Sequence, residues 1–66
     1  MQTKYPEIEV NLVGRSGNAF SIIGTVTNAL RRAGVSREEI STFQEDATSG
    51  DYNNVVTTCM SWVTVL

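Results

Sequence analysis

Arginine side chains form the densest group of charges that the sequence offers for binding chemistry. Arg31 and Arg32 are adjacent, and Arg37 follows shortly after them. A guanidinium group presents parallel N–H donors that match a carboxylate or a phosphate, so these residues predict contact with an acidic partner protein or with nucleic acid. The favoured interpretation is nevertheless structural, because cations in the last turn of a helix stabilise it through the helix dipole.

A second group with binding chemistry lies between a predicted strand and a predicted helix. Here Gly14 is followed by Arg15, Ser16, Gly17 and Asn18. Free N–H groups at a helix start can hold an anion, which makes these residues a candidate anion contact. The spacing matches neither a P-loop nor a dinucleotide fingerprint, because the Gly-Lys-Ser/Thr sequence and a third glycine are missing. A turn with a helix cap is the favoured interpretation of these residues.

Catalytic and metal-binding residue types are scarce. The chain has no histidine and a single cysteine, Cys59, so it lacks the commonest general base and the commonest metal ligand. A lone cysteine also excludes an intramolecular disulfide and a cysteine-only metal cage. We expect Cys59 to be a small buried apolar residue. The sequence predicts a protein that is not an enzyme and uses neither a metal nor a cofactor.

The composition predicts one small domain. A chain of 66 residues, 41% of them hydrophobic, can form a single core. Seven acidic and five basic residues give a net charge of −2, which disfavours sequence-independent binding to nucleic acid. The apolar stretches are too broken for a membrane span, and Glu7 and Glu9 stand where the apolar part of a secretory signal would lie. We expect a cytoplasmic protein that does not associate with membranes.

Hydrophobic periodicity predicts a small α+β fold of order β-α-α-α-β, with three helices packed on a short two-stranded ribbon. The first strand alternates apolar and polar residues over residues 7–13, after a flexible tail over residues 1–6. Apolar residues then recur at helical steps in three segments, and a short β segment ends the chain. The expected bounds are 19–33, 36–47 and 52–61 for the helices and 62–66 for the second strand.

The last segment of the chain is ambiguous. Its Val, Thr and Trp residues favour strands, so one continuous strand over residues 55–66 competes with the predicted helix. The helix is favoured because Val55, Cys59 and Met60 then share one apolar face. The direction of the final strand stays open.

The connection between the first two predicted helices carries the clearest local signals. Gly34 can take the left-handed conformation that ends a helix. Ser36 and Glu39 stand at the spacing of a capping box, in which the hydroxyl accepts from the Glu39 N–H and the carboxylate accepts from the Ser36 N–H. Val35 and Ile40 flank this box at the spacing of a hydrophobic staple. We predict two neighbouring helices that share one core.

Four other positions predict details of packing. Gly24 lies within the first predicted helix, where glycine costs about 1 kcal/mol relative to alanine, so we expect another backbone to pack closely there. Phe20, Phe43 and Trp62 are expected inside, because a small core needs their volume.

The predicted ribbon has exposed edges. Two strands alone leave backbone groups unpaired, and such edges can pair with a second molecule. A symmetric homodimer through a strand edge is therefore one expectation.

Residues 33–41, Ala-Gly-Val-Ser-Arg-Glu-Glu-Ile-Ser, resemble the turn and second-helix start of bacterial helix-turn-helix repressors. The resemblance implies that Ser36, Arg37 and Ser41 face DNA, with Val35 and Ile40 in the core. The sequence departs from such a reading helix in its charge, because acidic side chains repel phosphates. These acidic residues are Glu38, Glu39, Glu45 and Asp46.

The chain as a whole is similar to short uncharacterised bacterial or phage proteins. The similarity lies in the segments 17–22, 31–35, 47–52 and 60–63, and it implies no activity. The leading hypothesis is a small non-catalytic protein-interaction module that can also self-associate. The alternative is a nucleic-acid-binding accessory protein that uses the hairpin from Arg31 to Ser41.

Overall fold

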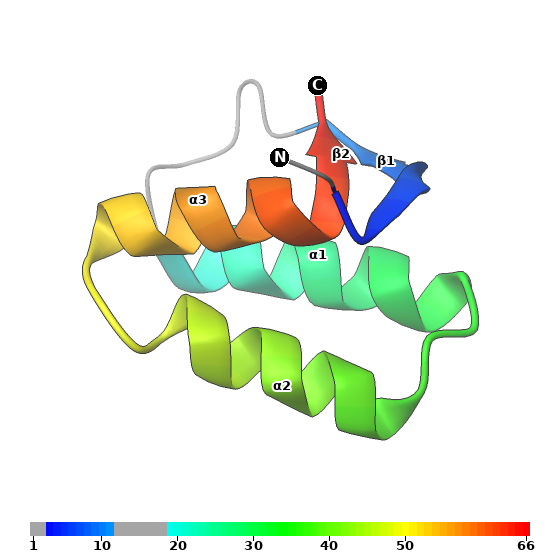
Figure 1. The fold of residues 1–66 in the computed structure, drawn as a ribbon, viewed down its shortest axis with the longest axis horizontal. Coiled ribbons are helices and arrows are strands. Elements are labelled where there is room, and N and C mark those ends of the chain that lie inside the picture. Colours follow the sequence, from blue (N-terminus) through cyan, green and yellow to red (C-terminus); the bar gives the residue numbers. More distant parts are fainter. Residues whose placement is uncertain (1–2, 12–18) are drawn as a thin grey trace.

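The computed structural model describes residues 3–11 and 19–66. These residues form β1 (Tyr5–Val10), α1 (Ala19–Arg32), α2 (Arg37–Ala47), α3 (Tyr52–Trp62) and β2 (Val63–Val65) (Figure 1). The predicted α+β fold and its β-α-α-α-β order are confirmed. The three helices lie on one side of the strand pair, and α2 runs back beneath α1 (Figure 1).

The strands β1 and β2 are parallel, which settles the direction that the sequence left open. Tyr5 pairs with Val63, and Val10 pairs with Val65. The helical layer supplies the long crossover that a parallel pair requires. Between Tyr5 and Glu9 the register is irregular, and there the Thr64 hydroxyl donates to the carbonyl of Pro6 at 2.8 Å.

The first strand begins earlier than predicted. Tyr5 and Pro6 belong to β1, so the expectation of a flexible tail over residues 1–6 is wrong for them. The reason lies at the far end of the chain: the Lys4 N–H donates to the Ser61 carbonyl at 2.9 Å, and the Thr3 hydroxyl donates to the Met60 carbonyl at 3.1 Å. Tertiary contacts with the end of α3 therefore order this segment. The predicted end of the strand, from residue 12 onward, lies outside the described residues.

A Schellman motif ends α1. Gly34 has a φ of 87°, in the left-handed region that glycine adopts without a steric penalty. Its N–H donates to Arg31 and the Val35 N–H donates to Leu30, so two carbonyls at the helix end are satisfied. The predicted glycine stop is confirmed.

The start of α2 confirms half of the predicted capping box. The Ser36 hydroxyl accepts from the Glu39 N–H at 3.3 Å, as expected. The Glu39 carboxylate does not complete the box; it accepts instead from the Tyr5 hydroxyl at 2.8 Å and pairs with Lys4. The Lys4 ammonium, just before β1, and the Tyr5 phenol, at the start of β1, take the place of the Ser36 N–H as partners of this carboxylate. Asp51 caps α3 in the predicted manner, accepting from the Asn54 N–H at 3.0 Å.

The segment before β2 is helical, and the alternative of one continuous strand over residues 55–66 is wrong. Steps of three and four residues bury Val55, Thr58, Cys59 and Trp62 on one face of α3. Met60 is 56% exposed because it lies about 100° around the helix from Cys59, so its expected place on the buried face is wrong.

The core forms between the three helices and the strand pair. Phe43 and Trp62 are buried in it, as predicted, and their rings meet edge to face with centroids 5.7 Å apart. The largest fully buried side chains come from four elements: Phe43, Leu30, Val26, Val63 and Cys59. One apolar interior therefore holds all the helices.

Two packing expectations are wrong. Phe20 is 79% exposed, because it lies beside the buried stripe of α1 rather than on it. No heavy atom of the described neighbours lies within 4 Å of the place where a Cβ on Gly24 would stand. Gly24 is thus not explained by close approach of another backbone.

Candidate functional site

A hollow of about 450 Å³ lies between the end of α1 and the outer side of α2. We call it the α1–α2 groove; its lining residues are Arg31, Val35, Arg37, Ile40, Ser41 and Gln44. The Schellman turn positions Arg31 and Val35, and the Ser36 cap fixes where α2 begins and hence where Arg37 stands. The Schellman turn and the Ser36 cap, both short-range interactions, therefore determine the geometry of one end of the groove.

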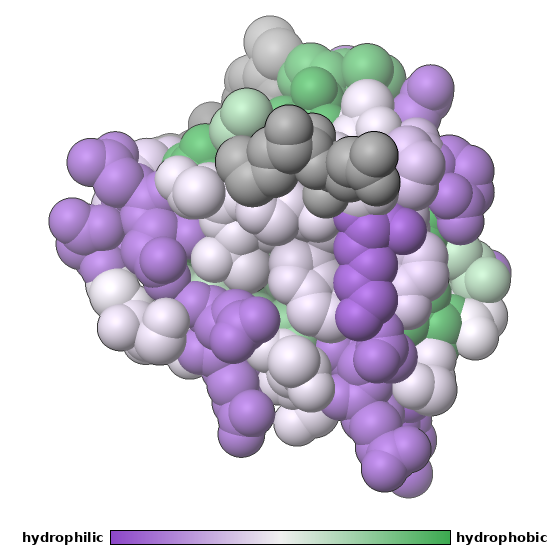
Figure 2. All heavy atoms as spheres, viewed as in Figure 1, coloured by the Kyte–Doolittle hydropathy of each residue, from purple (hydrophilic) through white to green (hydrophobic). Residues whose placement is uncertain are grey.

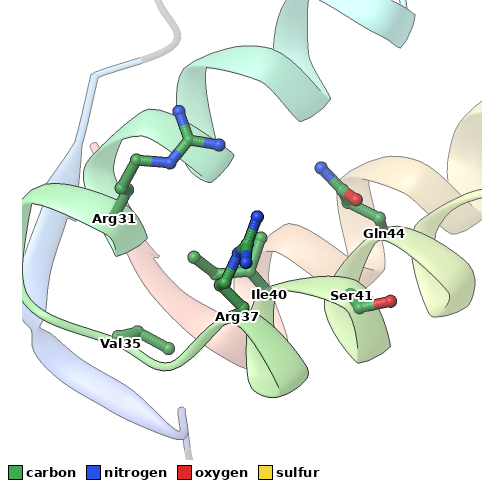
Figure 3. Close-up of a pocket in the computed structure, with 6 residues that line it drawn as sticks. All are labelled: Arg31, Val35, Arg37, Ile40, Ser41 and Gln44. Carbon is green, nitrogen blue, oxygen red and sulfur yellow. The ribbon is translucent and has the colours of Figure 1, made fainter.

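The groove combines cationic and amide donors with an apolar floor. Figure 3 shows the side chain of Arg31 extending from α1, and those of Arg37 and Gln44 extending from α2, into the space between the helices. Ile40 is 7% exposed and Val35 is half-buried below them. Such a surface can hold a carboxylate through the guanidinium groups while an apolar side chain rests on the floor.

Among residues 3–11 and 19–66, no acidic side chain lines the groove. Within the part of the chain that the structure describes, Arg31 and Arg37 form no ion pair, and the ion pair that is present joins Lys4 to Glu39 at 2.7 Å. Two exposed cations thus face one hollow without a counter-charge from the described residues. This is notable in a chain whose net charge is −2.

The structure divides the predicted arginine cluster. Arg31 and Arg37 come together in the α1–α2 groove, whereas Arg32 lines a separate hollow of about 360 Å³ with Glu9 and Asn28. Successive residues of a helix point about 100° apart, which takes Arg32 to the other side of α1. Arg32 therefore has an acidic neighbour and does not belong to the same site.

Gln44 is the residue of the groove that the sequence did not single out. Its amide donates to the hydroxyl of Thr27, which is 6% exposed, at 3.2 Å. The signal that could have found it is its spacing, because Arg37, Ser41 and Gln44 recur at steps of four and three along one flank of α2.

The same contact fixes how α2 lies against α1. Gln44 is two turns into α2 and still meets Thr27 of α1, so the helices run side by side in opposite directions. The connection at Gly34 is therefore built as a helical hairpin.

A cluster on the opposite flank of α2 holds the first strand. The Glu39 carboxylate lies against Lys4 and Tyr5, and hydrogen bonds from both lower the pKa of Glu39. The same carboxylate raises the pKa of Lys4 and of Tyr5. The Lys4 ammonium also lies 4.5 Å from the centroid of the Trp62 ring, a cation–π arrangement. This cluster ties the start of α2 to β1.

Cys59 and the acidic side chains are the remaining described residues with reactive or metal-binding groups. Cys59 is buried, as predicted, and burial raises its pKa to about 11, so the thiol is protonated at neutral pH. Among residues 3–11 and 19–66 no three His, Cys, Asp or Glu side chains gather as a metal site would require. The candidate anion contact at Arg15, Ser16, Gly17 and Asn18 lies outside the described residues.

Two further findings bear on the class of protein. None of the helices in the described ranges has the length and apolar character needed to cross a membrane. Comparison with protein-family models, with curated proteins and with solved structures gave no match.

Proposed function

We propose that this protein is a small non-catalytic interaction module that contacts another protein molecule through the α1–α2 groove. The observation that carries the proposal is the pair of exposed arginines, Arg31 and Arg37, which face one hollow without an ion-pair partner among the described residues. The groove would take carboxylate side chains of the partner, since the arginine fork matches a carboxylate in two parallel hydrogen bonds.

The surroundings of the groove favour a protein ligand over nucleic acid. Ile40 and Val35 offer an apolar floor that suits a partner's aliphatic side chain, whereas a nucleic-acid backbone presents phosphates. The exposed acidic residues Glu38, Glu45 and Asp46 lie on the same helix and would repel phosphates. Figure 2 shows hydrophilic side chains projecting along the edge of the molecule where α2 lies.

A titration with charged peptides and DNA tests the proposal. The ¹⁵N-labelled protein is titrated with blocked hexaglutamate, with blocked hexalysine and with a short DNA duplex, while the backbone amides of the groove and the side-chain amide of Gln44 are followed. Hexaglutamate is expected to shift these signals in a saturable, salt-dependent manner, and hexalysine is not.

Substitutions assign the effect to the groove. Because each exposed pair contributes about 0.2–1 kcal/mol, the Arg31→Ala/Arg37→Ala variant should bind about 2- to 30-fold more weakly. Arg32→Ala is the matched control and should bind like the parent, since Arg32 lines the other hollow. Absent shifts with hexaglutamate would refute the proposal, and tighter binding of the duplex would favour the nucleic-acid alternative.

A further inference from the structure

We infer that the partner received by the α1–α2 groove is a second copy of this chain, docked helix to helix through α2. The inference rests on the proposed function and names its partner. It is carried by the exposed residues Arg37, Ser41 and Glu45, which lie four residues apart and so form one ridge along α2. We call these three residues the α2 ridge.

The α2 ridge is self-complementary when two copies meet antiparallel. A two-fold axis through Ser41 places Arg37 of each copy opposite Glu45 of the other, because both lie four residues from the axis. The small side chain of Ser41 at the crossing point lets the two helices approach closely. One contact between identical surfaces thus forms two ion pairs.

Within its own helix neither charge has a partner. Arg37 and Glu45 are eight residues apart, which is about 12 Å along a helix and too far for an ion pair. Neither forms an ion pair with another described residue. Their order also opposes the helix dipole, since Arg37 is the first residue of α2 and Glu45 stands near its end. An antiparallel copy supplies the missing counter-charges at both ends.

The α1–α2 groove adds two contacts to this arrangement. Glu45 of the second copy, facing Arg37, comes to the side of α2 where Arg31 also stands. The same axis brings Glu38 of one copy opposite Gln44 of the other, and the Gln44 amide has a second N–H besides the one given to Thr27. Glu38 and Glu45 from α2 of the second copy therefore occupy the groove of the first.

The α2 ridge suits a second copy better than the edge of β1 does. Proline, charged side chains and an irregular register are features that keep strand edges from pairing with other molecules. β1 has all three, in Pro6, in the exposed Glu7 and Glu9, and in the break of register between Tyr5 and Glu9. The expected strand-edge dimer thus meets obstacles that α2 does not present.

Charge exchange on the α2 ridge tests the inference in the full chain. Arg37→Glu makes the ridge acidic and Glu45→Arg makes it basic, so each variant alone should lose self-association by sedimentation equilibrium at up to millimolar concentration and low salt. An equimolar mixture of the two variants should associate again, as should the double variant. Both substitutions place charges that the helix dipole favours, so loss of folding is not expected to explain the result.

Two control variants carry the same changes of charge, one from basic to acidic and one from acidic to basic, at residues outside the α2 ridge. Arg32→Glu and Asp46→Arg should self-associate within about twofold of the parent, apart from the general effect of net charge, which higher salt removes. Association that persists in both ridge variants, or a mixture that stays monomeric, would overturn the inference. A parent chain that is monomeric at every concentration also overturns it, and hexaglutamate binding to that monomer would leave the proposed function standing. If neither self-association nor hexaglutamate binding occurs, both fail.

Discussion

Truncation of Phe43 tests whether one interior holds all three helices. Phe43 is fully buried in α2, and its ring meets that of Trp62 in α3 edge to face, with the ring planes at 68°. A Phe43→Ala substitution removes the largest fully buried side chain, and such changes cost about 3–5 kcal/mol. The aromatic pair accounts for about 0.5–1.5 kcal/mol of that loss.

In a chain this small, such a loss is a large part of the total unfolding free energy. At about 0.05–0.15 kcal/mol per residue, a folded chain of 66 residues has an unfolding free energy of about 3–10 kcal/mol. Phe43→Ala should therefore remove about a third or more of that free energy, and at the lower end of the range it should leave the chain largely unfolded. Phe43→Leu keeps most of the volume, so it should lower the unfolding free energy by about 1–2 kcal/mol and leave a measurable transition.

Urea unfolding provides the assay. Trp62, the only tryptophan of the chain, reports on the interior by fluorescence, and far-ultraviolet circular dichroism reports on the helices. Met60→Ala is the control on the exposed side of α3, with an expected change below about 1 kcal/mol. A loss below about 1.5 kcal/mol for Phe43→Ala, or one no larger than that of the control, would show that α2 and α3 do not share the core described here.

Four local predictions follow from other contacts. Gly24→Ala should raise the unfolding free energy by about 1 kcal/mol in the same urea assay, because the helix gains and no described neighbour is displaced. Ser36→Ala should lower it by about 0.5–2 kcal/mol through loss of the cap. The pKa of Glu39 is lowered in the folded state, so its charged carboxylate stabilises the fold fully above the ordinary pKa of 4.5. This stabilisation is lost as the pH falls through the pKa of the folded state. In Glu39→Gln, urea curves taken across this pH range should show a smaller decrease of the unfolding free energy with falling pH. Cys59 should react slowly with a thiol reagent at neutral pH and rapidly in denaturant, since burial raises its pKa to about 11, and rapid native reaction would contradict its place in the core.

The parts of the fold that the sequence predicted correctly depend on short-range spacing. Gly34 and Ser36 act on backbone groups within a few residues of themselves, so their roles follow from the sequence alone. The burial of Phe43 and Cys59 likewise follows from helical steps. Periodicity was less reliable at the border of a stripe, as at Phe20, because neighbouring residues differ by about 100° in direction.

The features that sequence reasoning missed depend on residues distant in the chain. The partners of the Glu39 carboxylate are Lys4 and Tyr5, more than thirty positions away, and they displace the local capping interaction. The parallel direction of the strands is likewise set by how the helices pack. The candidate site is likewise predictable only in part. The sequence pointed to Arg31 and Arg37 as contact residues. Only the structure shows that Arg32 lies apart from them and that Gln44 contacts Thr27.

These distant contacts also determine how α2 can present a binding surface. An isolated helix of 11 residues is marginal in water, and Arg37 and Glu45 oppose its dipole. α2 is held instead by the contacts of Glu39 with Lys4 and Tyr5 on one flank and by Gln44 against Thr27 on the other. Phe43 anchors it in the core. Its backbone is thereby fixed before a partner arrives, and only exposed side chains such as those of Arg31 and Arg37 must be ordered on binding. Exposed ion pairs contribute only about 0.2–1 kcal/mol each, a net value that already includes the cost of ordering both side chains. The α1–α2 groove is therefore suited to reversible, salt-sensitive contacts rather than to a permanent interface.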